Sequence, residues 1–196
     1  TASTSADTSN HTAHTGADSS QAGNQGQNHM KAMHDAMNSM MQQMQSMKPT
    51  GDPDHDFAMM MKHHHQGAID MARVQVEGGA DTALKAGAQH TINEQQSEIA
   101  AFDRFLQSNQ PTGNSDYGQR AMKMMTPMSS IKMEGSSLDA MFASMMIPHH
   151  DDAVKMAEEY LKVGKNEELK RIARSIMQTQ PREIKAFQQW LSTNQG

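Results

Sequence analysis

Two adjacent histidines, each with a methionine four residues before it, form the pattern in this sequence most suited to chemistry. His64 and His65 follow Met60 and Met61, and Met71 comes seven residues after His64. On an α-helix, residues four apart lie on one face, so each imidazole would have a thioether one turn away. Thioethers are soft, uncharged ligands that select Cu(I) and silver, and imidazole binds copper in both oxidation states. The pattern therefore predicts a copper site.

The same pattern occurs twice because the sequence contains an internal repeat. With an offset of 85 residues, the second half aligns with the first without a gap. The second copy supplies five more candidate ligands: Met145, Met146, His149, His150 and Met156. The alignment continues into the next segment, in which three residues match three others: Gln95, Glu98 and Phe102 with Gln180, Glu183 and Phe187. A single methionine is more often a filler of the core than a ligand, but this duplicated combination with histidine favours metal binding.

The spacing of apolar and helix-breaking residues predicts an all-α fold. Apolar residues recur at intervals of three, four and seven over residues 84–106, which is typical of an amphipathic helix. Each repeat is predicted to be a helical hairpin, at 54–108 and 137–194, and the linker 109–136 contains a short methionine-bearing helix. One hairpin cannot cover its own apolar face. The two are therefore expected to dock as an antiparallel four-helix bundle with approximate two-fold symmetry.

A methionine-rich segment precedes the first hairpin. Residues 29–48 are predicted to form a peripheral helix with one face of methionines and a histidine: Met30, Met33, His34, Met37, Met40, Met41, Met44 and Met47. No Leu, Ile, Val or Phe occurs there, although an ordinary core-facing helix would use them. This face could be a promiscuous protein-binding surface or a series of soft-metal sites, and its histidine favours metal. Residues 1–28 are small and polar and are predicted to be a disordered tail.

Glutamine and glutamate on the second helix of each hairpin are predicted to support the metal ligands: Gln95, Glu98, Gln180 and Glu183. The glutamines lie within an apolar stripe, where an unsatisfied polar group is costly. We expect them to hydrogen-bond to the histidines or to each other, which would fix the imidazole rings. A core network that only fixes the helix register is the alternative. Adjacent histidines point about 100° apart on a helix, so one of each pair is expected inside the bundle and the other at its edge.

Composition limits the classes of function. The chain has 21 methionines among 196 residues, 11 histidines and no cysteine. A net charge of −5 with mixed signs and few aromatic residues argue against nucleic-acid binding. No apolar run approaches the roughly 20 residues that span a bilayer. The lack of cysteine and an opening that resembles a processed N-terminus favour a periplasmic or secreted protein.

The repeated residues resemble a bacterial family, the domain of unknown function three-hundred-five. Its pattern is Phe-x-x-Met-Met/Ile-x-x-His-His-x-x-Ala-x-x-Met-Ala followed by Gln-x-x-Glu-Ile, found here at 57–72 with 95–99 and at 142–157 with 180–184. The methionine-rich segment resembles that of a periplasmic copper-binding protein. The resemblance implies a ferritin-like four-helix bundle that binds Cu(I), Cu(II) and silver through the methionines and histidines of both repeats. It also implies a contribution to copper resistance and homeostasis.

Three other classes of function stay open. A ferritin-like bundle could be a metal-dependent oxidase, but the sequence lacks the Glu-x-x-His pairs that build di-iron centres. Zinc storage would leave the methionines unexplained, because thioether is a poor zinc ligand. A methionine-rich module could dock onto a copper exporter or another periplasmic copper carrier. We expect a metal-binding protein that is not an enzyme, in which His55 and His90 have surface or structural roles.

Overall fold

The computed structural model describes residues 18–132 and 135–194, which contain helices and no strand. Five helices are long: α1 (Asp18–Ser46), α2 (Pro53–Gly78), α3 (Thr82–Ser108), α5 (Leu138–Val163) and α6 (Glu167–Thr193). Between α3 and α5 lie the short helix α4 (Tyr117–Met124) and a 3-10 turn (Met128–Ser130). Within these ranges, no helix combines the length and the hydropathy that crossing a bilayer requires.

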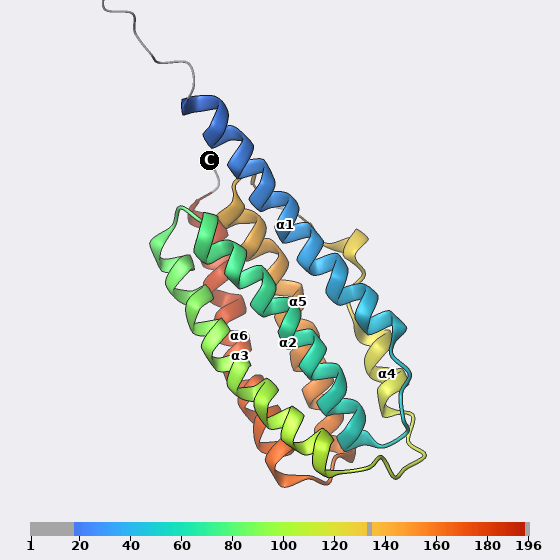
Figure 1. Ribbon diagram of the computed structural model, residues 1–196. Coiled ribbons are helices and arrows are strands. Elements are labelled where there is room, and N and C mark those ends of the chain that lie inside the picture. The colour runs from blue at the N-terminus through green and yellow to red at the C-terminus, as the bar shows by residue number, and fades with distance from the viewer. Residues whose placement is uncertain (1–17, 133–134, 195–196) are drawn as a thin grey trace, which may run out of the picture.

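The two repeats form two helical hairpins that pack into one helical bundle (Figure 1). Helix α2 packs along α3, α5 packs along α6, and α2 contacts α5. The helix starts repeat as well. Asp52 accepts hydrogen bonds from two backbone amides in the first turn of α2, and Ser137, 85 residues later, accepts one from the amide of Ala140 in α5. Such side-chain caps satisfy amides that lack a partner within the helix, so the sequence fixes where each hairpin begins.

Two aspartates at equivalent positions join the hairpins to each other. Asp139, at the start of α5, accepts hydrogen bonds from the backbone amides of Ala80 (3.0 Å) and Asp81 (3.2 Å), between α2 and α3. Asp54, at the start of α2, accepts them from the amides of Lys165 (2.8 Å) and Asn166 (3.1 Å), between α5 and α6. Each hairpin therefore binds the turn of the other hairpin, and the two sets of hydrogen bonds hold the bundle together from both ends.

Helix α1 lies along α2 and also contacts α5, and its methionine face is part of the core (Figure 1). Four of its methionines are at most 4% exposed: Met33, Met37, Met40 and Met44. The methionine-rich segment is thus a helix outside the two hairpins, as predicted, and its methionine face is turned toward them. The face of α2 and α5 turned away from α3 and α6 needs a cover, and flexible thioether side chains fill the irregular gaps there.

The start of α1 also differs from the prediction. The disordered tail was predicted to end at residue 28, but residues 18–28 are helical. Residues 24–28 are exposed, so burial does not hold them. Adding residues to an existing helix costs little because each added residue gains a backbone hydrogen bond, and the docked part of α1 supplies that nucleus. The rest of the predicted tail, residues 1–17, lies outside the described residues.

One repeat position decides which hairpin receives α1. Gly67 of α2 has no side chain, and a Cβ built there would lie 2.6 Å from Cγ of Met40. Its counterpart is Asp152 of α5, which accepts hydrogen bonds from the amide (2.7 Å) and hydroxyl (2.8 Å) of Thr126. Glycine therefore lets α1 approach α2, and aspartate ties the segment after α4 to α5.

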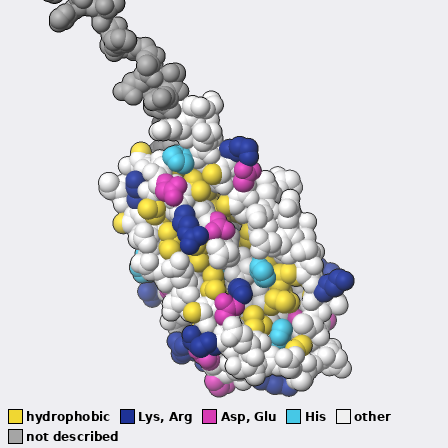
Figure 2. Space-filling model, viewed as in Figure 1, with side chains coloured by type: hydrophobic (Ala, Val, Ile, Leu, Met, Phe, Trp, Pro, Cys, Tyr) yellow, Lys and Arg dark blue, Asp and Glu magenta, His cyan; other side chains and the backbone are white. Residues whose placement is uncertain are grey.

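The surface carries charges of both signs. Figure 2 shows lysine, arginine, aspartate and glutamate interspersed over the face that α1 and α2 form, without a large region of one sign. Several charged residues of the protein are paired, including Lys62 with Asp103 and Lys155 with Asp151. Exposed pairs of this kind contribute little to stability.

Candidate metal centre

The first histidine of each pair lies at the centre of the helical bundle, and the two meet there. The rings of His64 (α2) and His149 (α5) have centroids 3.7 Å apart and an interplanar angle of 33°. Their exposed fractions are 0% and 2%. Nε2 of His149 donates a hydrogen bond to the backbone oxygen of His64 (3.0 Å), so its proton is on Nε2 and its Nδ1 carries a lone pair.

The remaining nitrogens of this pair have no hydrogen-bond partner. Nδ1 of His149 and both ring nitrogens of His64 are buried without a partner among the described residues. Buried polar atoms are normally satisfied, and those that are not require an explanation. In the neutral rings, Nδ1 of His149 and one nitrogen of His64 carry free lone pairs, and such nitrogens, held in a fixed orientation, are suited to bind a metal ion.

A small cavity separates this histidine pair from α1. It has a volume of about 10 Å³, and its walls include His64, His149, and the methionines Met37, Met40 and Met41. A volume of about 10–15 Å³ is the room that a single water molecule needs. Thioethers from α1 and imidazoles from both hairpins therefore surround a space of atomic size, and this donor set matches soft copper.

A second, larger pocket of about 140 Å³ lies between α1 and α4. Four methionines line it together with Gln45 and Pro127: Met41, Met44, Met122 and Met125. Met41 also lines the inner cavity, so the two spaces share one side chain. Met122 and Met125 were not among the predicted ligands. The high density of methionine in an otherwise polar linker was the signal that could have identified them.

The second histidine of each pair is also buried, next to a glutamate of the same hairpin. Nε2 of His65 donates to Oε2 of Glu98 at 2.6 Å. Nε2 of His150 lies 2.7 Å from Oε2 of Glu183, without the alignment of a hydrogen bond. Both rings are fully buried, so the prediction of an edge position is wrong. Helices α3 and α6 cover one side of α2 and α5, and α1 covers the other side. Both histidines of each pair therefore point into the protein.

The predicted role of the glutamines differs from the observed contacts. Gln95 and Gln180 are buried, as the apolar stripe predicts. Among the described residues, however, their Oε1 atoms have no hydrogen-bond partner, and no hydrogen bond joins either amide to a histidine. Carboxylates lie beside the second histidines instead. A charged oxygen is a stronger acceptor than an amide oxygen, which explains why the rings turn toward Glu98 and Glu183.

The other predicted ligands fall into two groups. The methionines of the repeated pattern are core residues at most 1% exposed, and they line neither the inner cavity nor the outer pocket: Met60, Met61, Met71, Met145, Met146 and Met156. On α1, Met33 is buried but lines neither space, Met30 and His34 are half-buried, and Nδ1 of His34 lies 3.2 Å from the backbone oxygen of Met30. Met47, just after the end of α1, is also half-buried. The structure thus gathers a subset of the predicted donors, and ligation by the others stays a prediction.

The central histidines are held in the neutral form. Burial lowers the pKa of His64 well below 6.5, and repulsion from His149, His65 and His150 lowers it further. Burial likewise lowers the pKa of His149, although its hydrogen bond to the His64 carbonyl opposes the shift. Neutral imidazole is the form that binds a metal ion, so this environment keeps the nitrogens available.

We expect the metal-free protein to lose stability as the pH falls below about 6.5, the pKa of an unfolded histidine. Below this pH the histidines of the unfolded chain bind protons, whereas folded His64 and His149 do not. The free energy of unfolding therefore decreases as the pH falls from about 6.5 to the lower pKa values of the folded histidines. The slope is at most about 1.4 kcal/mol per pH unit for each histidine. Urea unfolding at pH 7.5 and 5.0 measures it. His64→Leu should give a shallower slope, and an unchanged slope in this variant would contradict the assignment.

Comparison with known proteins is consistent with this architecture. The profile of the domain of unknown function DUF305 matches residues 4–106 and 54–191. CopM in its Cu(I)-bound form is 27% identical, with a TM-score of 0.58, over 73% of this chain and 98% of that chain. CopM in its Cu(II)-bound form is 29% identical, with a TM-score of 0.58, over 72% and 98%.

A silver-bound form of CopM gives a similar result, with 28% identity and a TM-score of 0.59 over 73% of this chain and 98% of that chain. No curated protein sequence matches the chain. The family profile, by contrast, spans both hairpins and includes both pairs of histidines. The all-α fold, the duplicated histidine pattern and this match agree: the chain belongs to the DUF305 family.

Proposed function

We propose that this protein binds copper, primarily Cu(I), in the cavity where α1 crosses the central histidine pair. The observation that carries the proposal is the set of donor atoms there. Sulfur-bearing side chains from α1 and nitrogen donors from α2 and α5 line a space of about 10 Å³. Three of those buried nitrogens have no hydrogen-bond partner among the described residues. A bound ion would satisfy nitrogens that otherwise lose their hydration without compensation.

The donor types favour copper over other metals. Methionine sulfur binds Cu(I) and silver well but is a poor ligand for zinc, and hard ions such as iron prefer carboxylate oxygen. The cavity wall does include Asp152, but both of its oxygens accept hydrogen bonds from Thr126. Because CopM, a structural relative, has Cu(I)-bound, Cu(II)-bound and silver-bound forms, the same ions are the natural candidates here.

We infer that the protein sequesters or transfers copper and does not catalyse a reaction. The outer pocket shares Met41 with the inner cavity, so an ion could pass from one set of thioethers to the next without leaving soft ligands. A periplasmic or secreted protein with this arrangement would exchange copper with an exporter or another carrier and contribute to copper resistance. The bundle itself would then be ferritin-like in shape but without a di-iron centre.

A substitution that removes sulfur and preserves volume tests the site. Met37→Leu, Met40→Leu and Met41→Leu together should weaken Cu(I) binding at least about 10-fold, or 1.4 kcal/mol, because the cavity loses its thioethers. Each such exchange usually costs less than about 1.5 kcal/mol in stability. Competition with a chromogenic Cu(I) chelator, under reductant and without oxygen, measures the affinity.

The matched control exchanges three half-buried methionines that line neither the inner cavity nor the outer pocket. Met59→Leu, Met141→Leu and Met177→Leu should leave the Cu(I) affinity within about two-fold of the parent, because no cavity sulfur is lost. Equal affinities of the two triple variants would overturn the proposed site. Failure of the parent protein to bind Cu(I) at all would overturn the function.

A further inference from the structure

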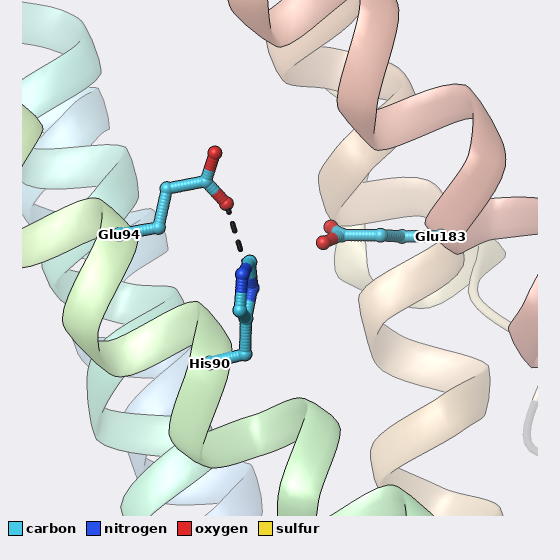
Figure 3. A group of neighbouring side chains, drawn as sticks. All are labelled: His90, Glu94 and Glu183. Carbon is cyan, nitrogen blue, oxygen red and sulfur yellow. Dashed lines mark ion pairs between the residues drawn. The ribbon is translucent and has the colours of Figure 1, made fainter.

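We propose that His90, Glu94 and Glu183 form a separate site for a divalent transition-metal ion, of which Zn²⁺ is the probe. One ligand atom of each residue lies within 4.8 Å of the other two. Figure 3 shows His90 and Glu94 one turn apart on α3, with Glu183 of α6 pointing toward them from the opposite helix. Nδ1 of His90 lies 3.8 Å from Oε2 of Glu94. This arrangement leaves room for a bound ion between three ligands that converge.

A buried histidine behind Glu183 supports the assignment. His150 is fully buried, its Nε2 lies 2.7 Å from Oε2 of Glu183, and neither ring nitrogen makes a hydrogen bond within the described structure. A carboxylate that ligates a metal ion is commonly supported from behind by a second polar side chain. Glu183 is therefore in position to contact an ion on one side and His150 on the other.

The charge around these residues favours a cation. Glu94 is close enough to both Glu98 and Glu183 to be repelled by their charges. The attractive charge interactions that oppose this repulsion come from histidines. The groove that Glu94 lines between α3 and α6 also contains Arg171, and Arg104, which pairs with Glu168 at 3.4 Å. Three carboxylates thus share one side of the bundle, and a divalent ion would reduce their mutual repulsion.

The ligand types separate this site from the methionine-lined cavity. One imidazole and two carboxylates suit Zn²⁺ and related divalent ions, and they lack the soft sulfur that selects Cu(I). Three protein ligands leave further positions on the ion for water, which the exposure of His90 allows. The site also joins the two hairpins, because α3 belongs to one and α6 to the other. These two helices pack mainly on α2 and α5 and contact each other sparsely.

The repeat provides a built-in comparison. At an offset of 85 residues, the counterparts of His90 and Glu94 are Ser175 and Thr179, and the counterpart of Glu183 is Glu98. The equivalent place in the other half therefore has one carboxylate and no imidazole. This asymmetry explains why a surface role was predicted for His90: its partners come from two helices, and the other repeat has Ser175 at the equivalent position.

A Zn²⁺ titration of the metal-free full chain tests the site. His90→Ala with Glu94→Gln should lose one equivalent of Zn²⁺ relative to the parent, and Ser175→His with Thr179→Glu should gain one at the symmetric position. The parent should also show a higher melting temperature with Zn²⁺, because a ligand that binds only the folded state stabilises it. The double-loss variant should show less of this increase.

The matched control is Gln89→Ala with Glu77→Gln, which removes an exposed amide and an exposed carboxylate near the same helices. It should bind as much Zn²⁺ as the parent, and circular dichroism should give the same helix content for all variants. A Zn²⁺ stoichiometry that is unchanged in both the loss and the gain variants would overturn the proposal. Without copper in the titration, this result does not depend on Cu(I) binding at the inner cavity.

Discussion

Gly67→Asp is expected to lower the free energy of unfolding by about 3–4 kcal/mol, although the same change is natural at the equivalent repeat position. The new Cβ would lie 2.6 Å from Cγ and 2.7 Å from Cβ of Met40, so α1 itself must shift. The carboxylate would also enter a buried position without the partner that Thr126 provides to Asp152. Urea unfolding measures the loss. Cu(I) affinity should fall with it, because Met40 lines the inner cavity.

The same substitution at Gly87 serves as the control. Gly87 is an exposed residue within α3, and a Cβ built there meets no atom within 4 Å. Aspartate and glycine have similar, low helix propensities, so Gly87→Asp should change stability by less than about 0.5 kcal/mol and leave Cu(I) affinity unchanged. Comparable losses at Gly67 and Gly87 would show that the approach of α1 to α2 does not depend on glycine.

Asp139→Ala should destabilise the protein by about 3–5 kcal/mol, because the substitution leaves several donors without an acceptor. Asp139 is 6% exposed. Its carboxylate accepts hydrogen bonds from the side chain of Gln75 (2.5 Å) and from the backbone amides of Ala80 (3.0 Å) and Asp81 (3.2 Å). Thermal and urea unfolding of the two proteins give the difference. Amide hydrogen exchange should increase first in the turn between α2 and α3.

An exposed aspartate provides the comparison for this variant. Asp35 pairs with Lys31 at 2.5 Å, and both side chains are more than half exposed. Asp35→Ala should therefore cost at most about 0.5 kcal/mol. A loss at Asp139 no larger than this would mean that the reciprocal contacts between hairpins contribute little, and that packing of α2 against α5 alone closes the bundle.

Much of the fold was predictable because it rests on patterns within short stretches of sequence. The apolar spacing over residues 84–106 and the repeat predicted a hairpin over 54–108, and α2 and α3 form one. For residues 29–48 the sequence left the role of the methionine stripe open, because such a stripe is compatible with burial, with a partner or with metal. Only the docked helix distinguishes these alternatives.

The candidate sites were also predictable only in part, where they rest on local sequence patterns. The repeat identified His64 and His149 as equivalent, since helical spacing and an offset of 85 residues can be read from the chain. Their direct contact, and the cavity that α1 forms with them, depend on how the hairpins pack. The density of methionine in the polar linker could have marked Met122 and Met125 as candidates, but no repeat or helical pattern linked them to α1, and only the packing placed them in one pocket with Met41 and Met44.

The sequence by itself determined the helices, their duplication and the types of donor atom, because these depend on residues a few positions apart. Tertiary structure decided which donors meet. It paired His64 with His149, placed Glu98 and Glu183 beside the other two histidines, and brought Glu183 to His90 and Glu94. The physical reason is that a binding site depends on distances between side chains of different helices, and only the packing of those helices sets them.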